Sequence, residues 1–403
     1  MSGRGEPGGE AGRGPGGGAG GRPGGGAGGR PGGGAGGEPG GGPVGGPVGG
    51  QGGSSGAGAG GAPQGARPGG GRGDDEAAAV RAVARRLGLP GLLDVHTHFM
   101  PDRVLRKVWA YFDGVEHLTG FAWPITYREE EDRRVELLRR FGVLRFTSLV
   151  YPHKAGMARW LNDWAADFSA RVPECLCTGT LYPEEGVGRY VTEHLDRGAR
   201  VFKVHLQVGD FNPNDPLLDP AWGALADTRT PVVVHCGSGP TPGAHTGPGP
   251  VGRLLARHPR LRVVVAHMGM PEYADFLDLA ERYDEVRLDT TMVFTDFSER
   301  LAPFPRREHG RLLALGDRVL LGSDFPNIPY GYLHQLEALE RLGLGDDWLR
   351  GVLHGNAAAL FAEADAGTDA GRTDAGRAGA GPAGVGGAGV GSGADSQGIH
   401  RNA

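Results

Sequence analysis

Cysteine, long apolar runs and an excess of either charge are all scarce in this 403-residue sequence. Its three cysteines, Cys175, Cys177 and Cys236, are too few for a disulfide framework, which predicts a reducing, cytoplasmic environment. No stretch approaches the roughly 20 apolar residues that span a bilayer, and the N-terminus lacks the apolar segment of a secretion signal. The net charge of −5 is small and both signs are interspersed, so we expect neither a membrane nor a nucleic acid as partner.

Large apolar side chains are also rare at both ends of the chain, where many of its 78 glycines lie. Residues 1–73 and 366–403 cannot bury enough surface to offset the entropy of ordering a glycine-rich backbone. We therefore predict two disordered tails around one folded domain, residues 74–365. A domain of this length suits a (β/α)8 barrel, which typically takes about 250 residues.

The predicted domain alternates short runs rich in valine and leucine with stretches of helical period, a pattern typical of βα units around a parallel sheet. Eight such runs are expected to be strands: 91–98, 143–151, 175–182, 200–207, 230–237, 261–269, 285–291 and 318–326. Eight strands favour closure into an α/β TIM barrel. An open doubly wound sheet usually carries a glycine-rich phosphate loop after its first strand, and here a His-x-His pair stands in that place.

Polar residues gather at the ends of these runs. Asp94, His96 and His98 lie two apart, so we expect all three to share the inward face of the first strand. His235, His267 and Asp324 come at the ends of later strands, and active sites of such barrels lie at the carboxyl ends of the strands.

Closure makes the first and last strands neighbours and brings these distant positions together. A single histidine on a strand is more often a core residue than a ligand, but agreement at several strand ends favours a metal site. Three imidazoles and a carboxylate suit one divalent ion, zinc above iron or manganese. Four residues form this predicted ligand set: His96, His98, His235 and Asp324.

The sequence resembles the amidohydrolase superfamily, in particular its amidohydrolase-related (amidohydrolase 2) branch, which includes enzymes like aminocarboxymuconate-semialdehyde decarboxylase. The resemblance covers essentially the whole predicted domain and depends on six motifs in order: DVHTHFMP (94–101), FKVH (202–205), VVVHCG (232–237), VVVAHMGMP (263–271), LLGSDFP (320–326) and HGNAAALFA (354–362).

The resemblance implies a metal-dependent hydrolase in which a metal-activated water attacks a C–N or C–O bond of a small amide, lactone or ester. Asp324 would bind the metal and act as general base, and His267 would polarise the substrate or relay a proton. Asp94 would support the site or the fold without binding the metal directly, and its side chain could orient an imidazole by accepting its other N–H.

Lys203 leaves the number of metal ions open, because some superfamily members carry a carboxylated lysine there that bridges two ions. In single-metal relatives a lysine at this position lines the pocket, and His205 shares its inward face. We predict one ion, with a binuclear site as the alternative.

Two other functions compete with hydrolysis. DVHTHFMP follows the form seen in decarboxylase-like relatives, so non-oxidative decarboxylation of an unsaturated or aromatic carboxylate is the alternative reaction. Those relatives commonly carry an arginine shortly after the histidine of the sixth strand, whereas here Arg282 lies far along an acid-rich segment. A non-enzymatic metal-binding scaffold is less favoured because every ligand and the general base are present. Homo-oligomerisation and the substrate's identity are left open.

Overall fold

The computed structural model describes residues 71–362, and the two predicted tails lie outside this range apart from residues 71–73, which begin the first helix. Residues 71–362 contain nine short strands, all of them parallel to their neighbours. They are β1 (Leu92–Asp94), β2 (Val143–Thr147), β3 (Cys175–Leu176), β4 (Thr178–Thr180), β5 (Val201–His205), β6 (Val232–His235), β7 (Val263–Val265), β8 (Val286–Asp289) and β9 (Val319–Leu320).

These nine strands occupy the eight predicted positions, because β3 and β4 are the two halves of one run interrupted at Cys177. Strands β1 to β3 form one sheet and β4 to β9 the other. Backbone hydrogen bonds join the first and last strands where regular pairing stops: Val95 N–H donates to Leu321 O at 2.9 Å, and His98 N–H donates to Phe325 O at 2.7 Å. The predicted (β/α)8 barrel is confirmed, with strands shorter than the apolar runs that encode them.

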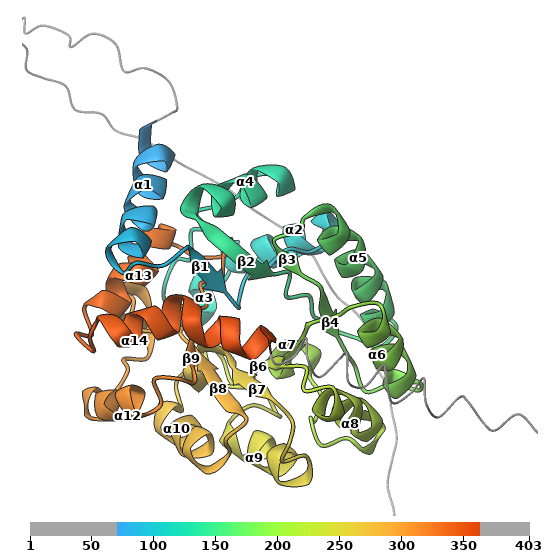
Figure 1. The fold of residues 1–403 in the computed structure, drawn as a ribbon. Coiled ribbons are helices and arrows are strands. Elements are labelled where there is room, and N and C mark those ends of the chain that lie inside the picture. Colours follow the sequence, from blue (N-terminus) through green and yellow to red (C-terminus); the bar gives the residue numbers. More distant parts are fainter. Residues whose placement is uncertain (1–70, 363–403) are drawn as a thin grey trace, which may run out of the picture. The chain divides into compact units, whose positions relative to one another are not determined.

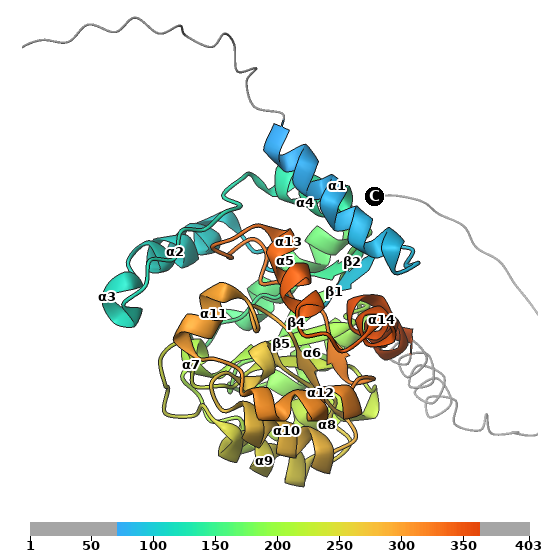
Figure 2. The same cartoon turned by 90° about the vertical axis from the view of Figure 1, so that its left-hand side faces the viewer.

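Helices surround the barrel, as Figures 1 and 2 show. The first ten are α1 (Gly71–Arg86), α2 (Asp102–Asp113), α3 (Glu116–Thr119), α4 (Glu131–Phe141), α5 (Ala158–Arg171), α6 (Val187–Asp196), α7 (Leu206–Gly209), α8 (Asp219–Asp227), α9 (Pro248–Arg257) and α10 (Tyr273–Arg282). The others are α11 (Asp296–Leu301), α12 (His309–Ala314), α13 (Tyr332–Glu340) and α14 (Asp346–Arg350), which continues through a π-turn (Gly351–Gly355) into helical residues 356–362. None of the helices in residues 71–362 is both long and apolar enough to cross a bilayer.

Helix α4 illustrates how the local sequence sets these elements. Val135, Leu138 and Phe141 recur at helical spacing and are buried against the barrel, while the charges between them face water. The helix ends where Gly142 adopts a φ of 80°, a left-handed conformation that glycine enters without steric cost.

Strands β6 and β7 are almost purely valine because both of their faces are buried.

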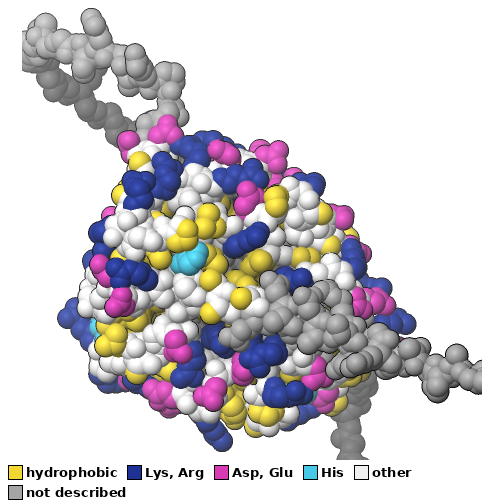
Figure 3. All heavy atoms as spheres, viewed as in Figure 1, with side chains coloured by type: hydrophobic (Ala, Val, Ile, Leu, Met, Phe, Trp, Pro, Cys, Tyr) yellow, Lys and Arg dark blue, Asp and Glu magenta, His cyan; other side chains and the backbone are white. Residues whose placement is uncertain are grey.

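The interior of the barrel has a core of its own. Helical residues 356–362 close this core at the end of the barrel where the strands begin. Side chains from opposite strands meet there with three residues of the helical segment 356–362, which crosses the front of Figure 1. This inner core includes Leu93, Val201, Val233, Val264, Leu320, Ala357, Leu360 and Phe361. Because this plug fills the end where the strands begin, only the end where they finish is open to a ligand. Figure 3 shows the surface around the plugged end, where acidic and basic side chains are interspersed.

Candidate metal centre

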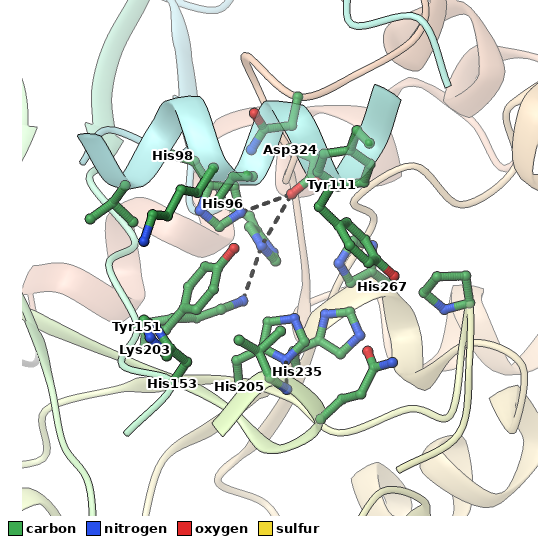
Figure 4. Close-up of a pocket in the computed structure, with 18 of the residues that line it drawn as sticks. His96, His98, Tyr111, Tyr151, His153, Lys203, His205, His235, His267 and Asp324 are labelled. Atoms are coloured by element: carbon green, nitrogen blue, oxygen red, sulfur yellow. Dashed lines mark hydrogen bonds and ion pairs between the residues drawn. The ribbon is translucent and has the colours of Figure 1, made fainter. Parts of the chain in front are cut away.

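Most of the predicted site residues meet in one cavity of about 780 Å³ at the carboxyl ends of the strands (Figure 4). They come from five places in the chain: the segment after β1, the second half of β5, the end of β6, the turn after β7 and the segment after β9. These cavity residues are His96, His98, Lys203, His205, His235, His267 and Asp324. The barrel therefore brings together positions more than 200 residues apart.

Three of these side chains form a buried site for a cation. His96, His98 and Asp324 each offer one ligand atom, and these atoms lie within 4.8 Å of one another. Asp324 Oδ1 is 2.9 Å from His98 Nε2 and 3.5 Å from His96 Nε2. Two atoms that each lie about 2.1 Å from one ion are separated by at most about 4.2 Å, so both distances fit a shared ion.

The hydrogen bonds on the far side of each imidazole fix which nitrogen faces Asp324. His98 Nδ1 is 2.9 Å from the carbonyl oxygen of Leu149, and His96 Nδ1 is 2.8 Å from Asp289 Oδ2. Both partners accept hydrogen bonds, so in the neutral rings Nδ1 carries the proton and Nε2 carries a lone pair. Lone pairs and a carboxylate that face one another are stabilised when a cation lies between them, which fits a metal centre.

Asp289, at the end of β8, is the residue that the sequence reasoning missed. It is fully buried, and its Oδ1 accepts backbone N–H bonds from His267 at 2.8 Å and Thr291 at 3.2 Å. Burial raises the pKa of this carboxyl group. A carboxylate at the carboxyl end of a predicted strand was the available signal, since the same rule identified Asp324.

Asp94 lies outside the ligand trio and supports the site, as predicted, but two details of its prediction were wrong: it does not share the inward face of His96 and His98, and it contacts no imidazole. The chain bends at Val95, so Leu93 and Val95 point into the barrel core while Asp94 turns toward α13, where Tyr332 donates its hydroxyl to Oδ2 at 2.9 Å. The other oxygen accepts backbone N–H bonds from His96 at 3.1 Å and Ser323 at 3.2 Å. Asp94 thus holds together the two segments that carry the site. Asp289, not Asp94, makes the contact with an imidazole that was predicted for Asp94.

Asp324 lies on a strained segment directly after β9. Its φ is 71°, and its backbone N–H donates to His96 O at 2.9 Å. Gly322 permits this path, since an added Cβ would lie 2.0 Å from Thr291 Oγ1 and 2.9 Å from His96 Cβ. Burial opposes ionisation of Asp324, but while no cation lies between them His98 Nε2 can instead donate a hydrogen bond to the carboxylate, and this contact and the nearby imidazoles lower the pKa of the carboxyl group.

Lys203, on β5, is completely buried with Nζ 3.1 Å from His96 Nε2. Burial lowers its pKa to about 8, although Asp289 and Asp324 oppose that shift. The ammonium therefore faces the lone pair that a metal would take. His96 itself is held neutral, because burial and then Lys203 lower its pKa well below the usual value.

The remaining histidines line the cavity beside the trio but are not part of it. His235 Nε2 is 3.1 Å from Gly239 O, so the neutral ring has its lone pair on Nδ1, and the ring of His205 stacks on it with centroids 4.0 Å apart. His267 has a left-handed backbone (φ 54°), and its Nδ1 is 3.1 Å from Thr291 O. Burial lowers the pKa of His267 to about 4, so near neutral pH it presents an unprotonated Nε2.

Other residues near the carboxyl ends of the strands divide between the cavity and the core. Tyr151 and Gln207 line the cavity, whereas Phe99 stacks on Phe168 in the core and Tyr182 packs on Phe211. Arg282, at the end of α10, is not among the residues that line it. Helix α2 forms a cavity wall that the sequence did not predict.

A closed barrel with a buried His-His-Asp trio at the carboxyl ends of its strands defines a metal-dependent TIM-barrel enzyme. Residues 93–362, about two thirds of the chain, match the family model described as amidohydrolase. The chain therefore belongs to the amidohydrolase family. No match was found among curated protein sequences.

The chain is similar to several solved structures, and the first of these supports the fold. An uncharacterised TIM-barrel protein from Bordetella bronchiseptica is 21% identical with a TM-score of 0.54, over 68% of this chain and 100% of that one. A 5-carboxyvanillate decarboxylase from Sphingomonas paucimobilis is 16% identical (68% and 99% coverage, TM-score 0.47). A probable 2-pyrone-4,6-dicarboxylic acid hydrolase from Acinetobacter baumannii is 13% identical with the same coverage and TM-score. At these identities the likeness concerns the fold alone.

Proposed function

We propose that the chain is a metal-dependent hydrolase that cleaves a C–N or C–O bond in a small amide, lactone or ester. The observation that carries this proposal is the contact of Asp324 with two imidazoles whose lone pairs face it, at 2.9 and 3.5 Å, in an open cavity. An ionised carboxylate beside a cation site is suited to receive a proton from an attacking water molecule.

His96, His98 and Asp324 would hold the ion, with His235 Nδ1 as a further donor from the same cavity. The nitrogen-rich set favours zinc, and we propose one ion per chain. A bound divalent ion supplies two effects, a lower pKa for coordinated water and polarisation of a substrate carbonyl.

The chain's own residues handle the proton and orient the groups around it. The lowered pKa of Asp324 keeps this carboxylate ionised, and its oxygen is the atom that would accept the proton from water. His267 accepts a hydrogen bond at Nε2 from water or substrate, because its Nδ1 proton is engaged by Thr291 O. Asp289 keeps the His96 lone pair directed at the site through its contact with Nδ1.

A substrate panel tests the reaction class. The full chain, purified and loaded with zinc, would be assayed with lactones, esters, amides and aromatic or unsaturated carboxylates, following acid release and carbon dioxide release in parallel. We expect hydrolysis in the first three groups, lost in Asp324→Asn. Carbon dioxide release without any hydrolysis would replace this proposal with the decarboxylase alternative. Metal analysis of the same preparation tests the single ion, which two equivalents per chain would contradict.

A further inference from the structure

Helix α2 contributes one whole face to the wall of the cavity. Six of its residues line the space at i, i+1, i+4, i+5, i+8 and i+9, which is the spacing of one helical face. They are Arg103, Val104, Lys107, Val108, Tyr111 and Phe112. The face is cationic near the start of the helix and aromatic near its end. At 1.5 Å per residue, Arg103 and Tyr111 lie about 12 Å apart along the axis.

The cations on this wall have no acidic partners. Arg103 from α2, Lys107 from α2 and Lys154 from the loop after β2 all line the cavity, and within residues 71–362 no carboxylate lies within ion-pair distance of any of them. Arg103 instead lies over the ring of Trp160, 4.3 Å from its centroid, a contact that positions the guanidinium without neutralising it. Asp102, the adjacent acid on α2, is paired with Arg106.

The cavity contains almost no negative charge to offset these groups. Asp324, in the metal centre, is the one acidic residue among the described residues that line it. Three solvent-exposed cations beyond the metal centre therefore border the cavity without a carboxylate beside them. A ligand that brings an anionic group to this wall replaces water around these cations with charge-assisted hydrogen bonds.

The apolar part of the wall and the size of the cavity define the rest of the ligand. Tyr111 points from α2 into the cavity on the side of His267 (Figure 4), and Trp123 and Trp160 add further aromatic surface. The volume of about 780 Å³ corresponds to about 26 water molecules at about 30 Å³ each and falls within the range of drug-sized ligand sites. A single six-membered ring would leave most of this space, and most of the α2 face, to solvent.

We propose that the substrate is an elongated amphipathic anion, with an apolar body of more than one ring or an equivalent chain. Its anionic group contacts Arg103, Lys107 and Lys154, and its scissile bond lies at the metal centre. This inference rests on the proposed function for the position of the reacting bond, but the binding of the anion by α2 does not depend on catalysis.

Binding measurements with non-reacting probes test the inference separately from the reaction. Isothermal titration of the zinc-loaded full chain would compare benzoate, biphenyl-4-carboxylate and the neutral biphenyl-4-carboxamide. We expect biphenyl-4-carboxylate to bind at least about tenfold more tightly than either other probe, from its second ring and its charge respectively. The triple variant R103Q/K107Q/K154Q, which removes all three cations, should bind the carboxylate and the carboxamide equally. Arg106→Gln, on the outer face of the same helix, is the matched control and should retain the preference.

Three results would overturn the inference: equal binding of benzoate and biphenyl-4-carboxylate, equal binding of the carboxamide and the carboxylate by the wild type, or a preference for the carboxylate that survives in R103Q/K107Q/K154Q. A preference that survives there but disappears when zinc is removed would place the anion on the metal instead of on α2. Charge-dependent binding in a chain that hydrolyses nothing would refute the proposed function and leave the anion site standing. Hydrolysis by a chain that shows no preference for the carboxylate would support the proposed function and refute the anion site.

Discussion

Replacing Asp289 with asparagine should weaken metal binding although Asp289 is not a ligand. Its Oδ1 accepts two backbone N–H groups, and its Oδ2 accepts the proton on His96 Nδ1. An asparagine has one accepting atom and one donating group, so it cannot serve all three donors. If the amide oxygen stays with the two backbone N–H groups, the NH2 group meets His96 Nδ1. That ring then moves its proton to Nε2 and loses the lone pair that faces the site.

The expected loss of metal affinity is about 10- to 100-fold, the usual effect of losing such a partner, or about 1.4 to 2.7 kcal/mol. Competition with a chromophoric zinc chelator measures it directly. Asp94→Asn is the matched control: it also removes a buried carboxylate beside His96, but its partners are two backbone N–H groups and a Tyr332 hydroxyl that can rotate. A D289N affinity within threefold of the wild type, or an equal loss in D94N, would refute the tautomer argument.

Three further expectations follow from the site. Asp324→Asn should lower kcat by about 10² to 10⁴, because it removes the proton acceptor, and steady-state rates on a hydrolysed substrate measure this. Gly322→Ala should destabilise the fold by about 1–3 kcal/mol through overlap with Thr291 Oγ1, while Gly310→Ala, which meets no atom within 4 Å, should not; thermal unfolding compares the two. The His267 pKa of about 4 lies below its ordinary value near 6.5, so the unfolded chain takes up the proton first as pH falls between these values. Unfolding free energies of the metal-free protein should therefore fall by up to about 3 kcal/mol from pH 6.5 to 4, and less steeply in His267→Gln; parallel curves would contradict this.

The architecture followed from the pattern of the sequence to a large extent. Eight apolar runs predicted eight strands because a parallel strand buried on both faces must be apolar throughout, as in β6 and β7. Helix α4 and its end at Gly142 could be predicted equally well, since the helical spacing and the left-handed glycine depend on residues of one short segment. Strand ends were less predictable: β1 stops at Asp94 because the chain bends there, and the alternation assumed for residues 94–98 fails beyond it.

The residues of the candidate metal site could be predicted from the sequence, but the residues that contact them could not. The sequence alone indicated a barrel. It also pointed to His96, His98 and Asp324, because histidine and aspartate side chains at the ends of several apolar runs are typical of a metal site. Only the tertiary structure decided that Asp289, not Asp94, contacts the imidazole ring of His96, that Lys203 faces the other nitrogen of that ring and that α2 lines the cavity. Such contacts join residues up to 193 positions apart, and they depend on side-chain direction and on where loops cross the barrel, which no local period encodes.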